Sequence, residues 1–241
     1  MTIDSSSGLF YAYAKSSTDD WSARFSITFA SRDVADTWYR LITDSVAAGY
    51  TRFAGVKRVS PQFYTHADQL TESLNDPRVA ERLRGQMFFT LLHDKGGRDF
   101  SHIPISNLRD HLSGDSFYLR SSSQPDTYWW YNPSTRSVMA SRENRSTFTI
   151  ALVDEDRAPG TVMIGSDYVH ITADEFDVHI GFENQQSQLW ASASASPIKF
   201  SSFQNRAFKV NSLNVYKINY HLEGPRLISA TSGRGERWEL V

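Results

Sequence analysis

Three short segments of this 241-residue chain end in an aromatic residue that follows a polar residue by two positions. They are Ser146-Thr147-Phe148, Gln188-Leu189-Trp190 and Glu236-Arg237-Trp238, and each closes a strand-like run. The aromatic residues lie 42 and then 48 positions apart. Self-similarity at such a spacing predicts a repeated supersecondary unit, which narrows the architectures open to the C-terminal half.

From about residue 113 onward the chain is predicted to be all β, because short apolar and aromatic runs alternate with turn residues. Twelve strands are expected, over Phe117–Ser121, Tyr128–Asn132, Ser137–Ser141, Thr147–Val153, Thr161–Gly165, Val169–Thr172, Asp177–Phe182, Gln188–Ser192, Ile198–Phe203, Ala207–Asn211, Val215–Tyr220 and Arg226–Ala230. They divide into three groups of four, and each group ends near one of the three aromatic segments.

This spacing, with the one literal Gln-x-Trp at residues 188–190, resembles the β-trefoil of ricin-B-type lectins. The resemblance covers roughly residues 114–241. It implies a trefoil fold with pseudo-threefold symmetry and a carbohydrate-binding function. It also implies that Phe148, Trp190 and Trp238 are buried beneath their repeats.

The chain departs from the lectin pattern in several ways. Ser146 and Glu236 stand where the other repeats would have Gln, and Phe148 replaces one Trp. The disulfides of many ricin-type repeats are missing, because the chain has no cysteine. A sandwich also accommodates twelve strands, so another all-β fold is the alternative.

Residues 1–112 mix helical and strand patterns and predict a separate α+β domain with the order ββαβα, a candidate for self-association. The expected strands are Leu9–Ala14, Arg24–Phe29 and Arg52–Val59. One helix should begin after Ser31 and end near Gly49. The second should begin at Asp76-Pro77, carry an apolar stripe from Val79 through Leu91, and end at Gly96-Gly97. Trp38 and Leu83 are expected in the core.

The charge pattern does not predict nucleic-acid binding, since the 25 basic residues are scattered and the formal net charge is −2. No apolar stretch approaches the ~20 residues that span a bilayer, so membrane insertion is not expected. The absence of cysteine and of a signal-peptide pattern at the N-terminus favours a cytoplasmic protein.

The densest aromatic run, Tyr128–Asn132, is the predicted glycan site. Neighbouring strand residues point to opposite faces, so two of the four rings should face outward. An exposed ring stacks on the apolar face of a pyranose, and an amide hydrogen-bonds its hydroxyls. The expected binding residues are Trp129, Trp130 and Asn132, assisted by Asp115 or Asp126. Burial on both faces, or an oligomer contact, is the alternative.

His170 and His179 flank a predicted four-residue turn. If Thr172 pairs with Asp177, the two histidines face one another, with Thr172 or Asp177 available as a third metal ligand. Two histidines alone make a weak metal site, and a solvated pair is the alternative. We expect no bound cofactor.

No catalytic motif such as Gly-x-Ser-x-Gly or His-Glu-x-x-His is present. Enzyme activity is therefore only an alternative to glycan binding, with an active site at the domain junction. Its candidate residues are His66, Asp68, His93, Asp94 and Asp99. A protein-interaction module is a third alternative.

Overall fold

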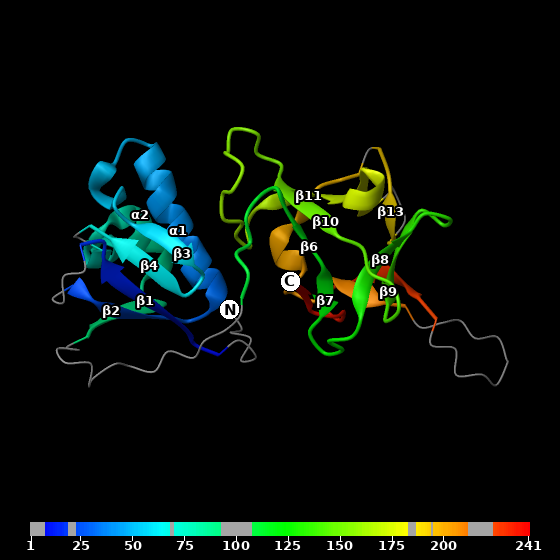
Figure 1. Ribbon diagram of the computed structural model, residues 1–241, viewed down its shortest axis with the longest axis horizontal. Helices are drawn as coiled ribbons and strands as arrows, with labels where there is room; N and C mark the ends of the chain where they lie inside the picture. Colours follow the sequence, from blue (N-terminus) through cyan, green and yellow to red (C-terminus); the bar gives the residue numbers. More distant parts are fainter. Residues whose placement is uncertain are drawn as a thin grey trace. The chain divides into compact units, whose positions relative to one another are not determined.

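The computed structural model describes residues 8–18, 23–67, 70–92, 108–182, 187–193, 195–211 and 224–241. The chain divides into two compact units, Met1–Asp110 and His111–Val241, called unit 1 and unit 2 below (Figure 1). This division lies two residues before the predicted boundary. Each unit has its own hydrophobic core.

Unit 1 packs two helices on a five-stranded sheet with the strand order β3-β4-β1-β2-β5. Strand β1 runs antiparallel to β2 and parallel to β4. The elements are β1 (Phe10–Ser16), β2 (Phe25–Phe29), α1 (Arg32–Ala47), β3 (Lys57–Ser60), β4 (Phe63–His66), α2 (Pro77–Leu83) and β5 (Met87–Leu91), with 3₁₀ turns at Thr51–Phe53 and Leu70–Asn75.

Both helices begin where the sequence predicts. The Ser31 hydroxyl accepts a hydrogen bond from the Val34 backbone N–H, at 3.3 Å, and caps α1. The Asp76 carboxylate does the same for α2, accepting from the Arg78 N–H at 3.0 Å. Gly49, with φ of 92°, supplies the left-handed residue after α1.

The second helix was predicted too long. It ends at Leu83, and Met87–Leu91 forms strand β5 instead. Gly85 takes a φ of 74°, which stops the helix, and the following aromatic run pairs with β2. The predicted strand Arg52–Val59 is likewise only partly present, and β4 was not expected, so the observed order is ββαββαβ.

Trp38 and Leu83 lie in the core of unit 1 as predicted, with 0% and 3% of their surfaces exposed. The Trp38 indole packs on Phe29 and Tyr64, and its Nε1–H donates to Ser73 Oγ at 3.1 Å. The indole therefore fills the space between helix and sheet and also satisfies its one polar group.

A buried ion-pair network lies beside this core. The Arg58 guanidinium, 3% exposed, reaches Asp36 at 2.7 Å and Asp110 at 2.6 Å. Burial alone would lower the pKa of Arg58, but Tyr64, Asp36 and Asp110 raise it above its ordinary value. Arg58 therefore stays charged, and it ties Asp110, the last residue of unit 1, to β3.

The described residues of unit 2 form twelve strands, so the all-β prediction is confirmed. They are β6 (Asp115–Phe117), β7 (Leu119–Ser121), β8 (Tyr128–Asn132), β9 (Ser137–Ser141), β10 (Phe148–Leu152), β11 (Tyr168–Ala173), β12 (Val178–Phe182), β13 (Leu189–Ala191), β14 (Ile198–Lys199), β15 (Phe208–Val210), β16 (Arg226–Ala230) and β17 (Trp238–Leu240).

The main sheet is one continuous path of paired strands. Its order is β17-β7-β8-β9-β13-β12-β11-β10-β6, with β14 on β11 and the β15–β16 pair on β9. Strands β6 and β7 stand near opposite ends of this path, yet only Tyr118 separates them in the sequence. The predicted strand Thr161–Gly165 is reduced to a single bridge at Val162, and Val215–Tyr220 lies outside the described residues.

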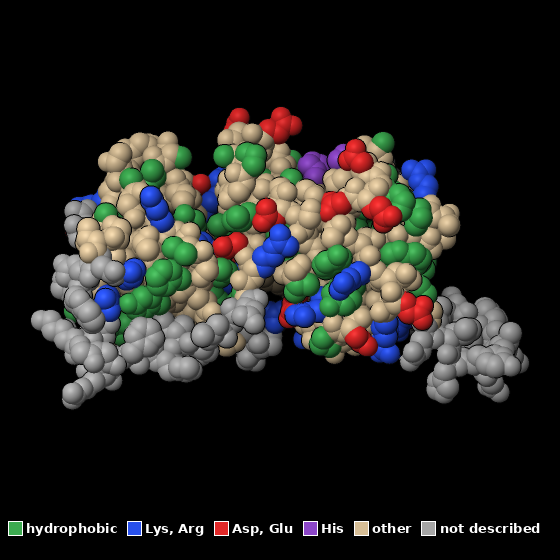
Figure 2. Space-filling model, viewed as in Figure 1, with side chains coloured by type: hydrophobic (Ala, Val, Ile, Leu, Met, Phe, Trp, Pro, Cys, Tyr) green, Lys and Arg blue, Asp and Glu red, His purple; other side chains and the backbone are tan. Residues whose placement is uncertain are grey.

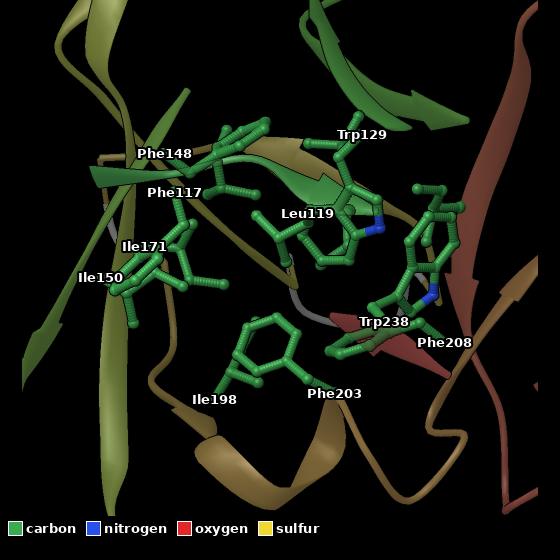
Figure 3. Packing of buried hydrophobic residues seen from close by; sticks show 14 of the residues in the cluster. Phe117, Leu119, Trp129, Phe148, Ile150, Ile171, Ile198, Phe203, Phe208 and Trp238 are labelled. Carbon is green, nitrogen blue, oxygen red and sulfur yellow. The ribbon is translucent and has the colours of Figure 1, made fainter. Parts of the chain in front are cut away.

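The strands of unit 2 surround a hydrophobic core that contains Trp129, Phe148 and Trp238 (Figure 3). The Trp129 ring centroid lies 5.3–5.9 Å from those of four other aromatic residues, namely Phe148, Phe203, Phe208 and Trp238. Phe148 and Trp238, the aromatics of two predicted repeats, are 0% and 1% exposed.

The third repeat aromatic is placed differently. Trp190 is only half-buried, and Leu189 beside it is the residue that enters the core. The prediction that Trp190 is a fully buried core residue is therefore wrong. Side chains alternate along β13, so only one of these two neighbours can face inward.

Candidate binding site on the outer face of β8

Strand β8 presents alternate side chains to the core and to the surface. Trp129 and Tyr131 face inward and are 0% and 3% exposed, while Tyr128, Trp130 and Asn132 are half-buried on the outer face. Two of the four rings thus face each way, as strand geometry requires. Trp129 has no surface with which to stack on a ligand, so it is a core residue and not a binding residue.

Trp130 is flanked by an apolar row across the sheet. Its cross-strand partner on β9 is Met139, which in turn pairs with Leu227 on β16. All three side chains are half-buried. An aromatic ring set in a partly exposed apolar strip offers a flat surface for stacking.

Charged side chains gather at the Tyr128 end of this face. The Arg145 guanidinium lies 4.6 Å from the Tyr118 ring centroid and 5.7 Å from that of Tyr128, within cation–π range. Arg142 pairs with Asp126 at 3.3 Å, and both side chains are about half exposed, at 46% and 63%. Asp126 thus carries an accessible carboxylate close in sequence to Tyr128.

A second ion pair lies at the Tyr128 end of the outer face. Arg120, the cross-strand partner of Tyr128, binds Glu239 at 2.9 Å. Figure 2 shows acidic and basic side chains of unit 2 interspersed with hydrophobic ones, without a continuous basic surface on the face in view. The surface around Tyr128 is therefore of mixed charge, and it offers both donors and acceptors.

The predicted residues do not all meet at one place. Asn132 lies four residues from Tyr128, about 13 Å along the strand. Its Oδ1 accepts the Ser134 N–H at 3.0 Å, so the amide already stabilises a turn. Asp115 lies on β6, which pairs with β10 and not with β8. Asn132 still shares the outer face with Tyr128 and Trp130, and its amide N–H donates to Sδ of Met139, the cross-strand partner of Trp130, at 3.7 Å. Asp126 precedes Tyr128 by two positions in the sequence. The structure therefore leaves only Asp115, among the predicted residues on the surface, away from this face.

The histidine hairpin has a different register from the predicted one. Thr172 pairs with His179, not with Asp177, which begins no strand and has a φ of 48°. His170 is consequently diagonal to His179, with ring centroids 6.2 Å apart. The Thr172 hydroxyl hydrogen-bonds His179 Nδ1 at 3.1 Å. Among the described residues no group of three His, Cys, Asp or Glu side chains gathers as a metal site.

The enzyme alternative gains no support from His66. This residue is 1% exposed, and its Nε2 hydrogen-bonds the Ala23 carbonyl at 2.8 Å. It packs against Phe25 at 5.7 Å and serves the core. Asp68, His93, Asp94 and Asp99 lie outside the described residues.

Sequence reasoning missed Tyr118, Arg142 and Arg145. Their contribution depends on the register of β7 on β8 and on the path of the loop after β9, neither of which is encoded in a local pattern. The available signal was the density of basic residues in Ser141–Ser146 beside an aromatic strand.

The fold and this surface define a two-unit protein, in which an α+β unit precedes an all-β unit with an aromatic and charged outer strip. No family model matches the chain, and comparison with curated proteins gives no significant match. Over the part of the chain that is described, no helix has the length and apolar character needed to cross a membrane.

Proposed function

We propose that unit 2 is a lectin-like carbohydrate-binding unit whose binding surface is the outer face of β8 around Tyr128 and Trp130. The observation that carries the proposal is the position of these two aromatic side chains on one face, both partly exposed, next to the Asp126–Arg142 pair. Rings bind the C–H face of a pyranose, and the charged groups exchange hydrogen bonds with its hydroxyls.

Two of the three repeat segments support a trefoil-like reading of this unit. The Ser146 hydroxyl accepts the Tyr131 backbone N–H at 3.1 Å, and the Glu236 carboxylate accepts the Ser123 N–H at 3.2 Å. Two residues later, Phe148 and Trp238 enter the same core. In both segments the polar residue secures a neighbouring backbone and the aromatic residue fills the interior.

A single shallow site of this kind should bind weakly, with a dissociation constant near the millimolar range. Self-association of the chain would then raise the apparent avidity on a multivalent glycan surface. Glycan-array binding at several protein concentrations, with the oligomeric state measured in parallel, tests both parts.

The decisive variants are Trp130→Ala and Tyr128→Ala. Each should reduce glycan binding by about tenfold while the unfolding midpoint changes little, because both rings are on the surface. Tyr168→Ala is the matched control, since this ring on β11 is 58% exposed and away from the strip. The lectin proposal is contradicted if the wild-type protein binds no glycan, or if the Trp130 and Tyr128 variants keep full binding. A protein-interaction role would then replace it.

A further inference from the structure

The Arg145 guanidinium lies beside the outer face of β8 with its hydrogen-bond donors unused. Its contacts are the rings of Tyr118 and Tyr128, which are 6.3 Å apart and almost perpendicular, at 81°. The side chain is exposed, and within the described part of the chain it makes no hydrogen bond and no ion pair. Glu143, the acidic residue nearest to it in the sequence, is likewise not paired with it there. Ring faces attract a cation without taking up its N–H groups, so the donors remain available to a ligand.

Hydrogen bonds on both sides of Arg145 hold its backbone in place. Before it, the Ser141 hydroxyl at the end of β9 accepts the Asn144 backbone N–H at 3.1 Å. After it, the Ser146 N–H donates to the Trp129 carbonyl on β8 at 3.1 Å. The guanidinium is thus positioned by its loop as well as by the two tyrosine rings. A side chain held in this way loses less conformational entropy when it binds a ligand.

Two other arginines at the Tyr128 end of this face already have carboxylate partners. Arg120 binds Glu239 at 2.9 Å, and Arg142 binds Asp126 at 3.3 Å. Arg145 differs from both, because no carboxylate of the described residues pairs with it. A neutral saccharide would leave the charge of this guanidinium to solvent. A carboxylate instead matches the planar group with two parallel, charge-assisted hydrogen bonds.

We propose that the site on β8 selects saccharides that carry a carboxylate, such as sialic or uronic acids, and that Arg145 binds this group. The inference rests on the glycan-binding function proposed above and names the class of saccharide. Trp130 follows Tyr128 by two positions, about 7 Å along the strand. The pyranose ring therefore stacks on Trp130, while the carboxylate is bound by Arg145 at the Tyr128 end. Arg145 is the residue that determines specificity for the acid.

The test is isothermal titration calorimetry of the full chain with two matched pairs of saccharides. One pair is sialyllactose and its methyl ester, and the other is trigalacturonic acid and its methyl ester. Esterification removes the charge of the carboxylate and keeps the rest of the ligand. The acid should bind about fivefold more tightly than the ester in at least one pair, since the ion pair is solvent-exposed. The pair that shows the preference identifies the source of the carboxylate.

Three variants assign the preference to one side chain. Arg145→Gln should make the acid bind as weakly as the ester and leave the affinity for the ester unchanged. Arg145→Lys keeps the charge but loses the two parallel donors, so it should retain only part of the preference. Arg136→Gln is the matched control, because Arg136 is also exposed but lies in the turn at the Asn132 end of β8. Thermal unfolding of each variant checks that the fold is intact.

The outcomes separate this inference from the proposed function. Acid and ester that bind the wild-type chain equally would overturn the inference and leave glycan binding in place. The same holds for an acid preference that Arg145→Gln leaves unchanged, or that Arg136→Gln reduces as much. A chain that binds neutral glycans on the array but none of these four saccharides also overturns the inference. A chain that binds no saccharide at all contradicts the proposed function, and this inference with it.

Discussion

Trp129 and Trp238 pack edge to face, with ring centroids 5.7 Å apart and planes at 69°, although they stand 109 positions apart in the sequence. Both indole Nε1 atoms are buried, and neither has a hydrogen-bond partner among the residues that the structure describes. The core of unit 2 thus contains two indole N–H groups without an acceptor, because their rings are buried there. Large aromatic side chains contribute enough buried area to outweigh such a cost.

Replacing Trp129 by Ala should lower the free energy of unfolding of unit 2 by about 3–5 kcal/mol, because a large cavity remains at the centre of the core. Trp130→Ala, one position along, should cost below about 1 kcal/mol. Urea denaturation followed by near-ultraviolet circular dichroism measures both. Equal losses for the two variants would show that β8 is covered on both faces.

Trp38→Ala should destabilise unit 1 by a similar amount, about 3–5 kcal/mol. The indole is fully buried against Phe29 and Tyr64. Ser73→Ala removes only the acceptor of the indole N–H and should cost about 1–3 kcal/mol, since that donor becomes unsatisfied. Chemical denaturation measures the free energy of unfolding of both variants. A smaller loss of stability for Trp38→Ala than for Ser73→Ala would contradict the packing role of the Trp38 indole.

Arg58→Met should destabilise unit 1 by about 3 kcal/mol, because Asp36 is left in the interior without its closest cation. The control is Arg52→Met. Its pair with Glu72 has a similar separation, 2.9 Å, but the side chains are 55% and 40% exposed. Exposed pairs contribute below about 1 kcal/mol. If both variants lose equally little, the buried network does not contribute to stability.

The Glu236 carboxylate should make unit 2 less stable in acid. Burial alone would raise its pKa, but hydrogen bonds from Ser123 and Ser121 more than offset this and hold the pKa below the ordinary 4.5. A depressed pKa stabilises the fold above the unfolded-state value, and the stabilisation is lost as pH falls through the folded-state value.

Glu236→Gln should therefore lower the unfolding midpoint most near pH 7 and least below pH 4. Thermal scans of wild type and variant across this range give the comparison, with Glu175→Gln at an exposed site as the control. A difference between wild type and Glu236→Gln that does not change with pH would mean that the charge of Glu236 has no part in stability.

Gly235→Ala should destabilise unit 2, because an added Cβ would overlap the backbone carbonyl of Phe208. That carbonyl also accepts the Glu236 N–H at 2.6 Å, so the backbone would have to move at a hydrogen-bonded position. We expect a loss of about 1–3 kcal/mol in denaturation experiments. Gly224→Ala, where nothing lies within 4 Å of the added atom, should be close to neutral.

Local sequence patterns predicted the positions of strands and helix caps better than they predicted which strands pair. Tyr128–Asn132, Ser137–Ser141 and Arg226–Ala230 are strands with the expected bounds, because alternation and turn residues are local. The caps at Ser31 and Asp76 are local for the same reason.

The predictions that were wrong concern features that depend on contacts between residues far apart in the sequence. Met87–Leu91 fits a helical stripe, and only its pairing with β2 makes it a strand. Neighbouring strands likewise decide the register that makes His170 diagonal to His179, and the choice of Leu189 over Trp190 for the core. Within the candidate site, the alternation of rings on β8 was predictable, but the approach of Arg145 to Tyr118 was not.

The pairing of β17 with β7 also sets an order of events during synthesis. Trp238 pairs with Ser121, and Val241 and Tyr118 exchange two backbone hydrogen bonds at 3.0 and 2.9 Å. At about 5–20 residues per second, β7 leaves the ribosome roughly ten seconds before its partner strand is made. During that interval one edge of β7 is unpaired and the Trp129 site lacks Trp238. Unit 2 is therefore most exposed to misassociation while the chain is still being translated, when unit 1 has already emerged complete.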